Sequence, residues 1–161
     1  MLFAELGLFA GKPLRNKGTA VHQRTGRSNF RRMPKILIVD DSATIRKMVR
    51  ASLRGLEEAE FVEAGNGLEA IEQIALGPVA LIVLDLNMPD MHGVDVLKFV
   101  RRHQGFRDVP VVVLTTRGDE SSRETALAAG ATQYLTKPFA PQVLLSAALD
   151  LLSDAAEGHR G

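Results

Sequence analysis

The chain has 161 residues, of which 45% are apolar and 24% are charged, so one globular domain with an ordinary core can form. Cysteine is absent, which excludes disulfides, thiolate metal sites and a cysteine nucleophile, and a cytoplasmic protein is expected. The net charge of +1 hides an asymmetry, because residues 1–33 contain seven basic residues and one acid, whereas the rest of the chain contains thirteen basic and eighteen acidic residues.

Residues 1–33 form a basic leader with no sustained strand or helix periodicity after Gly11. Its composition cannot bury enough apolar surface to offset the entropy lost on ordering, so we expect disorder. It is either a solvated tail, including the case in which Met33 is the true first residue, or a basic arm for nucleic acid or an anionic membrane. We favour the solvated tail and expect no nucleic-acid partner. No apolar run approaches the roughly 18 residues needed to span a bilayer, so no membrane insertion is expected.

The first half of the remaining chain alternates short apolar runs with amphipathic stretches. Lys35–Val39 predicts a first strand, in which every residue after Lys35 is apolar, as in a strand covered on both faces. Ser42 can cap a helix that follows, in which apolar residues recur at helical spacing. Glu60–Ala64 predicts a second strand, Leu68–Ala75 a second helix, and Val79–Leu84 a third strand.

The second half continues the same alternation. Gly93 precedes a third helix, and Val109–Leu114 predicts a fourth buried strand. A helix is predicted over Asp119–Ala129, because a glycine suited to a helix end follows it. Thr132–Thr136 predicts the fifth strand and Val143–Leu152 the last helix.

Five strands alternating with five helices predict an α/β fold in which a doubly wound, five-stranded parallel sheet is covered on both faces. This domain is expected to occupy residues 34–153, and residues 154–161 are expected to form a frayed C-terminal tail. Its length fits one such domain and leaves no room for a second.

Polar side chains follow four of the predicted strands at the point where each strand ends. The first strand runs into Asp40 and Asp41, the third into Asp85, the fourth into Thr115 and the fifth into Lys137. In a doubly wound sheet, ligands bind at the carboxyl ends of the strands. We therefore expect these five groups to meet at one edge of the sheet.

The chemistry of these groups matches phosphoryl transfer. Three converging carboxylates repel one another and favour a hard cation, Mg²⁺ or alternatively Mn²⁺, which takes oxygen ligands and commonly bridges to a phosphate. An aspartate can act as a nucleophile toward phosphorus, and the transferred group needs positive or hydrogen-bonding partners for its oxygens. The ammonium of Lys137 and the hydroxyl of Thr115 are partners of these kinds.

Four segments of the chain, in the order in which they occur, resemble the motifs of a known family. They are DDSATIRKMV (Asp40–Val49), LDLNMPDMHG (Leu84–Gly93), VVLTTRGDE (Val112–Glu120) and YLTKPF (Tyr134–Phe139). Together they resemble the receiver domain of two-component response regulators, and the chemotaxis branch of single-domain regulators more closely than the transcription-factor branch. The resemblance implies a flavodoxin-like sheet with strand order 2-1-3-4-5.

The resemblance also implies a role for each residue of the site. Asp85 is the phosphoacceptor. Asp41 and Asp85 are implied to bind Mg²⁺ directly, together with the backbone carbonyl of Asn87, whereas Asp40 acts mainly through water. Thr115 and Lys137 are implied to contact the phosphoryl oxygens.

Two further features are implied by the resemblance. Tyr134 matches a switch aromatic whose rotamer follows the movement of Thr115, and Lys137-Pro138 matches a peptide bond that is usually cis in the family. The residue after Thr115 is usually small in the family, whereas here it is Thr116, and Arg117 occupies a position that influences dephosphorylation. Phosphoryl lifetime therefore does not follow from the sequence.

The expected function is a switch that takes part in its own phosphorylation and dephosphorylation, rather than an enzyme. The expected partners are a histidine kinase and a downstream protein effector, such as a motor switch component in chemotaxis or motility. One alternative is a phosphate sink without its own output. Another is a magnesium-dependent phosphohydrolase of the haloacid dehalogenase type, which needs a general acid where this chain has Asn87, a residue unable to transfer a proton.

Overall fold

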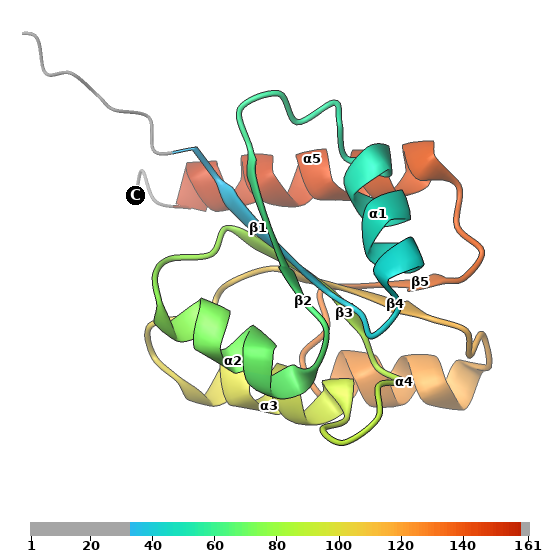
Figure 1. Cartoon of the computed structure of the whole chain (residues 1–161). Coiled ribbons are helices and arrows are strands. Elements are labelled where there is room, and N and C mark those ends of the chain that lie inside the picture. Colours follow the sequence, from blue (N-terminus) through green and yellow to red (C-terminus); the bar gives the residue numbers. More distant parts are fainter. Residues whose placement is uncertain (1–32, 159–161) are drawn as a thin grey trace, which may run out of the picture. The chain divides into compact units, whose positions relative to one another are not determined.

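The structure is a computed structural model that describes residues 33–158, so the predictions for residues 1–32 and for residues 159–161 lie outside the described residues. Five strands alternate with five helices along the described chain (Figure 1). The strands are β1 (Lys35–Val39), β2 (Glu60–Ala64), β3 (Leu81–Asp85), β4 (Val111–Thr115) and β5 (Gln133–Thr136). The helices are α1 (Ala43–Ser52), α2 (Gly67–Ala75), α3 (Gly93–Arg102), α4 (Glu120–Ala128) and α5 (Pro141–Gly158).

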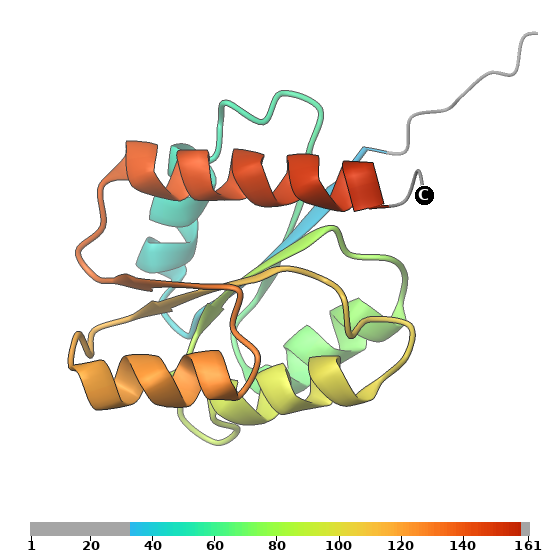
Figure 2. The same ribbon diagram turned by 180° about the vertical axis from the view of Figure 1, so that it is seen from behind.

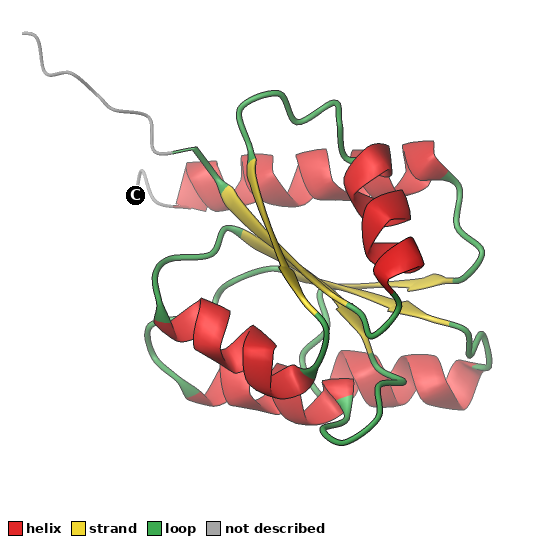
Figure 3. Cartoon of the chain, viewed as in Figure 1, coloured by secondary structure: helices red, strands yellow, loops and turns green. Residues whose placement is uncertain are grey.

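The strands form one parallel sheet in the order β2-β1-β3-β4-β5, which confirms the predicted fold and strand order. Helices α1 and α5 cover one face, and α2, α3 and α4 cover the other; the view from behind shows the same two layers (Figures 1 and 2). In Figure 3 the strands lie between these layers. None of the described helices combines the length and the apolar character that crossing a membrane requires.

The almost continuous apolar runs of the inner strands β1, β3 and β4 follow from this double cover. Ile36 and Ile38 of β1 pack in the core cluster that also holds Leu144 of α5, whereas Leu37 and Val39 pack in the cluster on the opposite face. Successive strand residues point to opposite faces, so a strand covered on both sides must be apolar at every position. The apolar runs were therefore a sound basis for predicting the sheet.

The boundaries of several elements differ from the sequence predictions, most of all those of β3, β4 and α5. β4 begins at Val111 rather than Val109, because Pro110 has no N–H to donate and the N–H of Val109 bonds to Phe106 in the preceding turn. β3 likewise begins two residues later than predicted and ends on Asp85 itself. The consequence for the site is that Asp85 and Thr115 are the last residues of their strands rather than the first residues of loops.

The last helix, α5, is longer than predicted. It continues from the predicted end at Leu152 to Gly158, so residues 154–158 are helical where a frayed tail was expected. No glycine or proline interrupts the segment from Gln142 to Glu157, and Leu151 and Leu152 still pack against the core cluster beneath the helix. Helix propensity and continued packing together carry the helix to the first glycine.

Arg101 near the end of α3 joins three segments on the side of the domain opposite the predicted site. Its Nε donates to the carbonyl of Gly130 at 2.8 Å, and its Nη1 donates to the carbonyls of Val109 at 2.7 Å and Arg107 at 2.9 Å. Gly130 ends α4 with a φ of 107°, a conformation that favours glycine. The guanidinium thus satisfies carbonyls that the loops before β4 and β5 would otherwise leave without a donor.

Replacing Arg101 by methionine should lower the free energy of unfolding by about 3 kcal/mol, because the apolar stem is kept while two partly buried carbonyls lose a charged donor. Urea denaturation followed by circular dichroism measures the change. Arg102→Met is the matched control, because the side chain of Arg102 is exposed and its replacement should change the free energy of unfolding little. Equal midpoints for the two variants would contradict the structural role of Arg101.

Candidate metal and phosphoryl-acceptor site

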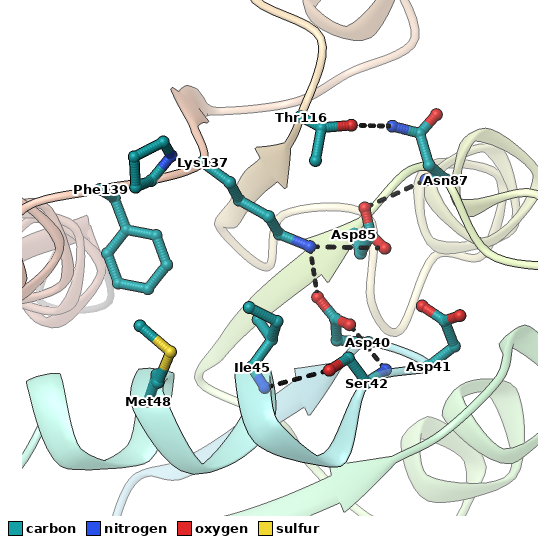
Figure 4. Close-up of a pocket in the computed structure, with 11 residues that line it drawn as sticks. Asp40, Asp41, Ser42, Ile45, Met48, Asp85, Asn87, Thr116, Lys137 and Phe139 are labelled. Carbon is teal, nitrogen blue, oxygen red and sulfur yellow. Dashed lines mark hydrogen bonds and ion pairs between the residues drawn. The ribbon is translucent and has the colours of Figure 1, made fainter.

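The carboxyl ends of β1, β3 and β5 surround a cavity of about 460 Å³, which Figure 4 shows in close-up. The side chains of α1 and of the loop after β5 make one wall of this cavity apolar. Its polar lining is Asp40, Asp41, Ser42, Asp85, Asn87, Thr116 and Lys137, and its apolar lining is Ile45, Met48, Pro138 and Phe139.

Three carboxylates meet in this cavity, as the sequence predicted. Asp40, Asp41 and Asp85 each offer an oxygen, and these oxygens all lie within 4.8 Å of one another. Asp40 and Asp85 are 3% and 4% exposed, whereas Asp41 faces solvent. A set of carboxylate oxygens, partly buried and open to water on one side, suits Mg²⁺, which binds one or two carboxylates and keeps several waters. The donor set therefore fits the predicted metal.

Lys137 supplies the positive charge of the site. Its Nζ lies 2.6 Å from Oδ2 of Asp40 and 3.5 Å from Oδ2 of Asp85 (Figure 4). The backbone N–H of Ser42 donates to the other oxygen of Asp40 at 2.9 Å, so Asp40 is held on both sides. The hydroxyl of Ser42 also caps α1, as predicted, by accepting from the N–H of Ile45. The predicted cis peptide bond between Lys137 and Pro138 is present.

Burial raises the pKa of the Asp85 carboxyl above its ordinary value of 3.8. The N–H of Asn87, which donates to Oδ1 of Asp85 at 3.1 Å, and the Lys137 ammonium lower this pKa, but they do not offset the loss of hydration. The neighbouring carboxylates Asp40 and Asp41 raise it further. The negative charge on Asp85 therefore destabilises the folded chain. A cation in the cavity would reduce this destabilisation.

A stability prediction follows from this raised pKa. A carboxyl with a folded-state pKa above the unfolded one binds more protons when folded, so it lowers stability as pH rises from 3.8 through the folded pKa. Without divalent metal, Asp85→Asn should therefore unfold at a higher temperature than the native chain at pH 7. The difference should vanish below pH 3.8, where both side chains are neutral. Thermal melts across this range in EDTA test it, and a lower melting temperature for the variant at pH 7 would contradict it.

Thr115 and Tyr134 are joined through the backbone of Arg117. The buried hydroxyl oxygen of Thr115 accepts from the N–H of Arg117 at 3.2 Å, and the carbonyl of Arg117 accepts from the hydroxyl of Tyr134. Tyr134 packs its ring against the core cluster on the α2–α3–α4 face, and burial raises the pKa of its phenol. The two residues predicted to act as a switch are thus in one hydrogen-bonded chain, although their roles stay predictions.

Two features of the site were not predicted from the sequence. The side-chain amide of Asn87, expected to act only through its backbone carbonyl, donates to the hydroxyl of Thr115 at 2.8 Å. In addition, Thr116 lines the cavity, whereas Thr115 is not among the described residues that line it. From the sequence, Thr115, as the polar residue at the end of its strand, is expected to meet the carboxylates, whereas its neighbour Thr116 lines the cavity.

A five-stranded doubly wound sheet with an acidic cluster and a lysine at the carboxyl ends of its strands defines the class of receiver-like α/β domains. The family model of the response regulator receiver domain matches residues 36–149. The chain therefore belongs to the response regulator receiver family, as the sequence motifs indicated.

Among curated proteins, the chain is similar to chemotaxis protein CheY1 of Helicobacter pylori, with 40% identity over 111 residues that make up 68% of this chain and 90% of that protein. It is also similar to a chemotaxis protein CheY homolog of Campylobacter jejuni, with 38% identity over 119 residues, 73% of this chain and 92% of that protein. Among solved structures, chemotaxis response regulator CheY4 of Vibrio cholerae is 35% identical with a TM-score of 0.68, and the match covers 74% of this chain and 98% of that one.

Proposed function

We propose that this chain is a single-domain response regulator in a phosphorelay, which accepts a phosphoryl group on Asp85 and thereby switches its binding to another protein. The observation that carries the proposal is the meeting of Asp40, Asp41 and Asp85 with Lys137 in one cavity. A carboxylate oxygen of Asp85 attacks phosphorus and forms the new P–O bond. The P–N bond of a phosphohistidine donor, or the P–O bond of a small acyl phosphate, breaks, and the leaving group takes the electron pair.

The residues of the cavity have different roles in this transfer. Lys137 is close enough to both buried carboxylates to reach an oxygen of a group placed on Asp85. Asp41 and Asp85, with the backbone carbonyl of Asn87, would hold Mg²⁺, and Asp40 would act through water. When bound, Mg²⁺ neutralises charge that develops on the transferred group. The raised pKa of Asp85 and its repulsion from its neighbours also favour cation binding before transfer.

The partners of the switch are proposed from the relatives. Two-component receivers take phosphoryl groups from histidine kinases, and the curated relatives are named chemotaxis proteins. We assign a protein effector in chemotaxis or motility as the output. A phosphate sink would take up phosphoryl groups without binding an effector, and a pull-down in which the phosphorylated form captures no partner would favour it. A cytoplasmic location stays a prediction.

A switch, rather than a hydrolase, is favoured by the residue two positions after the acceptor. Asn87 has no titratable side chain, and its amide is occupied with the hydroxyl of Thr115. It therefore cannot serve as the general acid that sustained hydrolysis of a phosphomonoester requires. Continuous release of phosphate from a phosphomonoester, measured over many turnovers, would contradict the proposal.

The proposal is tested with the whole chain, Mg²⁺ and acetyl phosphate. Intact-protein mass spectrometry should show the gain of one phosphoryl group, and peptide mapping after borohydride reduction should place it on Asp85. Removing the metal with EDTA should prevent the gain, because the carboxylate cluster then lacks its cation. Uptake that persists in EDTA, or a phosphoryl group on another residue, would contradict the proposed chemistry.

A further inference from the structure

The side chain of Asn87 joins the loop after β3 to the end of β4, a contact for which the proposed phosphoryl transfer has no use. Its Nδ2 donates to Oγ1 of Thr115 at 2.8 Å and lies 3.4 Å from Oγ1 of Thr116. The backbone N–H of the same residue donates to Oδ1 of Asp85 at 3.1 Å. Figure 4 shows Asn87 reaching both the acceptor carboxylate and Thr116. One residue therefore contacts the acceptor and the hydroxyl expected to respond to it.

Thr115 is held where it is by two hydrogen bonds. Its Oγ1 accepts from Nδ2 of Asn87 and from the N–H of Arg117, which fills both acceptor positions of a hydroxyl oxygen. Thr115 is 1% exposed, and of the two adjacent threonines it is Thr116 that lines the cavity around Asp85. The hydroxyl of Thr115 must therefore move toward the cavity to contact a group bound there, and this movement strains or breaks the bond from Asn87.

The same movement would reach the surface of the domain through Arg117. Its N–H is bonded to Thr115, and its carbonyl accepts from the hydroxyl of Tyr134 on β5. A displacement of Thr115 would break the hydrogen bond that its hydroxyl accepts from the N–H of Arg117 and so release one restraint on that backbone. The bond from Asn87 thus restrains a chain of contacts that begins beside Asp85 and ends at Tyr134.

We propose that the side-chain amide of Asn87 is a latch, a positioning residue that holds Thr115 in its unphosphorylated position and sets the free-energy cost of switching. This inference rests on the proposed function, because it requires Thr115 to respond to a group on Asp85. Any ligand that binds the switched state must overcome this cost, so removing the latch strengthens apparent binding. One net intramolecular hydrogen bond corresponds to a factor of about five in that equilibrium.

The test is a titration of the whole chain with beryllofluoride in Mg²⁺, in which fluorine NMR of the bound species gives the midpoint. Asn87→Ala should lower the midpoint about fivefold. Asn87→Leu keeps a branched side chain of similar size without a donor and should do the same. Asn66→Ala is the control, because Oδ1 of Asn66 accepts a 2.9 Å hydrogen bond from the N–H of Glu69 at the start of α2, and loss of this bond should leave the midpoint unchanged.

A double-mutant cycle shows whether Asn87 acts through Thr115. Thr115→Val removes the hydroxyl and keeps the shape, so in this background Asn87→Ala should no longer lower the midpoint. A midpoint that is unchanged or raised in Asn87→Ala, a shift in Asn87→Ala without one in Asn87→Leu, or a shift that persists with Thr115→Val would each overturn the latch. If the native chain gains no phosphoryl group from acetyl phosphate, the proposed function fails and the latch falls with it; failure of the latch alone leaves that uptake intact.

Discussion

Asp85→Asn should lose all uptake of a phosphoryl group from acetyl phosphate, whereas the native chain should gain one. The substitution keeps the size of a side chain that is 4% exposed, and it keeps an oxygen that can accept from the N–H of Asn87. It removes the nucleophilic carboxylate and one charge of the predicted metal cluster. An amide oxygen is a poor nucleophile toward phosphorus, so no remaining atom at this position can form the acyl phosphate. Intact-protein mass spectrometry gives the result directly.

Loss of uptake in Asp85→Asn must be separated from loss of folding. The raised pKa of Asp85 makes this separation possible, since the variant is expected to be more stable than the native chain at pH 7 without metal. A protein that is more stable and yet inert would show that the carboxylate serves chemistry at the expense of stability. Asp95→Asn, an exposed acid of α3, is the control and should keep normal uptake. Phosphoryl uptake by Asp85→Asn at the native rate would disprove the assignment of the acceptor.

Much of the fold and the composition of the site could be predicted because both depend on local pattern. A strand that is covered on both faces must be apolar throughout, so Lys35–Val39 was recognisable without any knowledge of its neighbours. Parallel strands deliver their carboxyl ends to one edge, so Asp40 and Asp85 had to meet once the strands were placed. Neither inference requires the register between strands.

The contacts between loops could not be predicted, because they depend on that register. Asp85 lies opposite Leu114, which places the residue two positions beyond Asp85 next to Thr115. A pairing shifted by one residue would turn the side chains of β4 to the opposite faces and separate Asn87 from that hydroxyl. The Asn87–Thr115 bond is therefore a property of the pairing of β3 with β4, not of either segment alone.

Arg101 shows a second reason why part of the structure was missed. Its partners are backbone carbonyls of Gly130, Arg107 and Val109, and carbonyls carry no signature in the side-chain sequence. From the periodicity of the helix alone, such an arginine would be assigned to the solvent-exposed face with the other charged residues. The end of α5 was missed for a related reason, since the packing of Leu151 and Leu152 depends on where the helix crosses the sheet.

Gly93→Ala should lower the free energy of unfolding by about 3 kcal/mol, which is at the upper end of the usual cost of overpacking. A Cβ atom at Gly93 would lie 2.2 Å from the carbonyl oxygen of Asp85 and 2.6 Å from Cα of Leu86. Both are backbone atoms, so no change of side-chain rotamer can relieve the contact. The backbone at the end of β3 must move instead. Chemical denaturation of the metal-free chain measures the loss.

Gly67→Ala is a matched control for this effect. Each glycine is buried and is the first residue of its helix, so the intrinsic gain in helix propensity is the same at both positions. A Cβ at Gly67 would lie 2.7 Å from Cγ and Sδ of Met91, which a change of rotamer can move, and 2.8 Å from Cβ of Met91, which moves only with its loop. Gly67→Ala should therefore cost less than Gly93→Ala, where all three contacts are with backbone atoms of the strand end, and equal losses would show that the backbone contact is not responsible.

Gly93→Ala should also slow phosphoryl uptake, in addition to its cost in stability. The atoms that must move include the carbonyl of Asp85, and the N–H of Gly93 is itself bonded to the carbonyl of Leu86 at 3.2 Å. A shift there changes both the direction of the acceptor carboxylate and the position of the Asn87 carbonyl predicted to bind Mg²⁺. A displacement of about 1 Å can reduce a rate about a hundredfold even where the reacting groups are intact. At a temperature where the variant is still folded, its phosphoryl uptake should therefore fall far below that of Gly67→Ala. Native uptake rates in folded Gly93→Ala would show that the close approach of α3 to Asp85 serves packing alone.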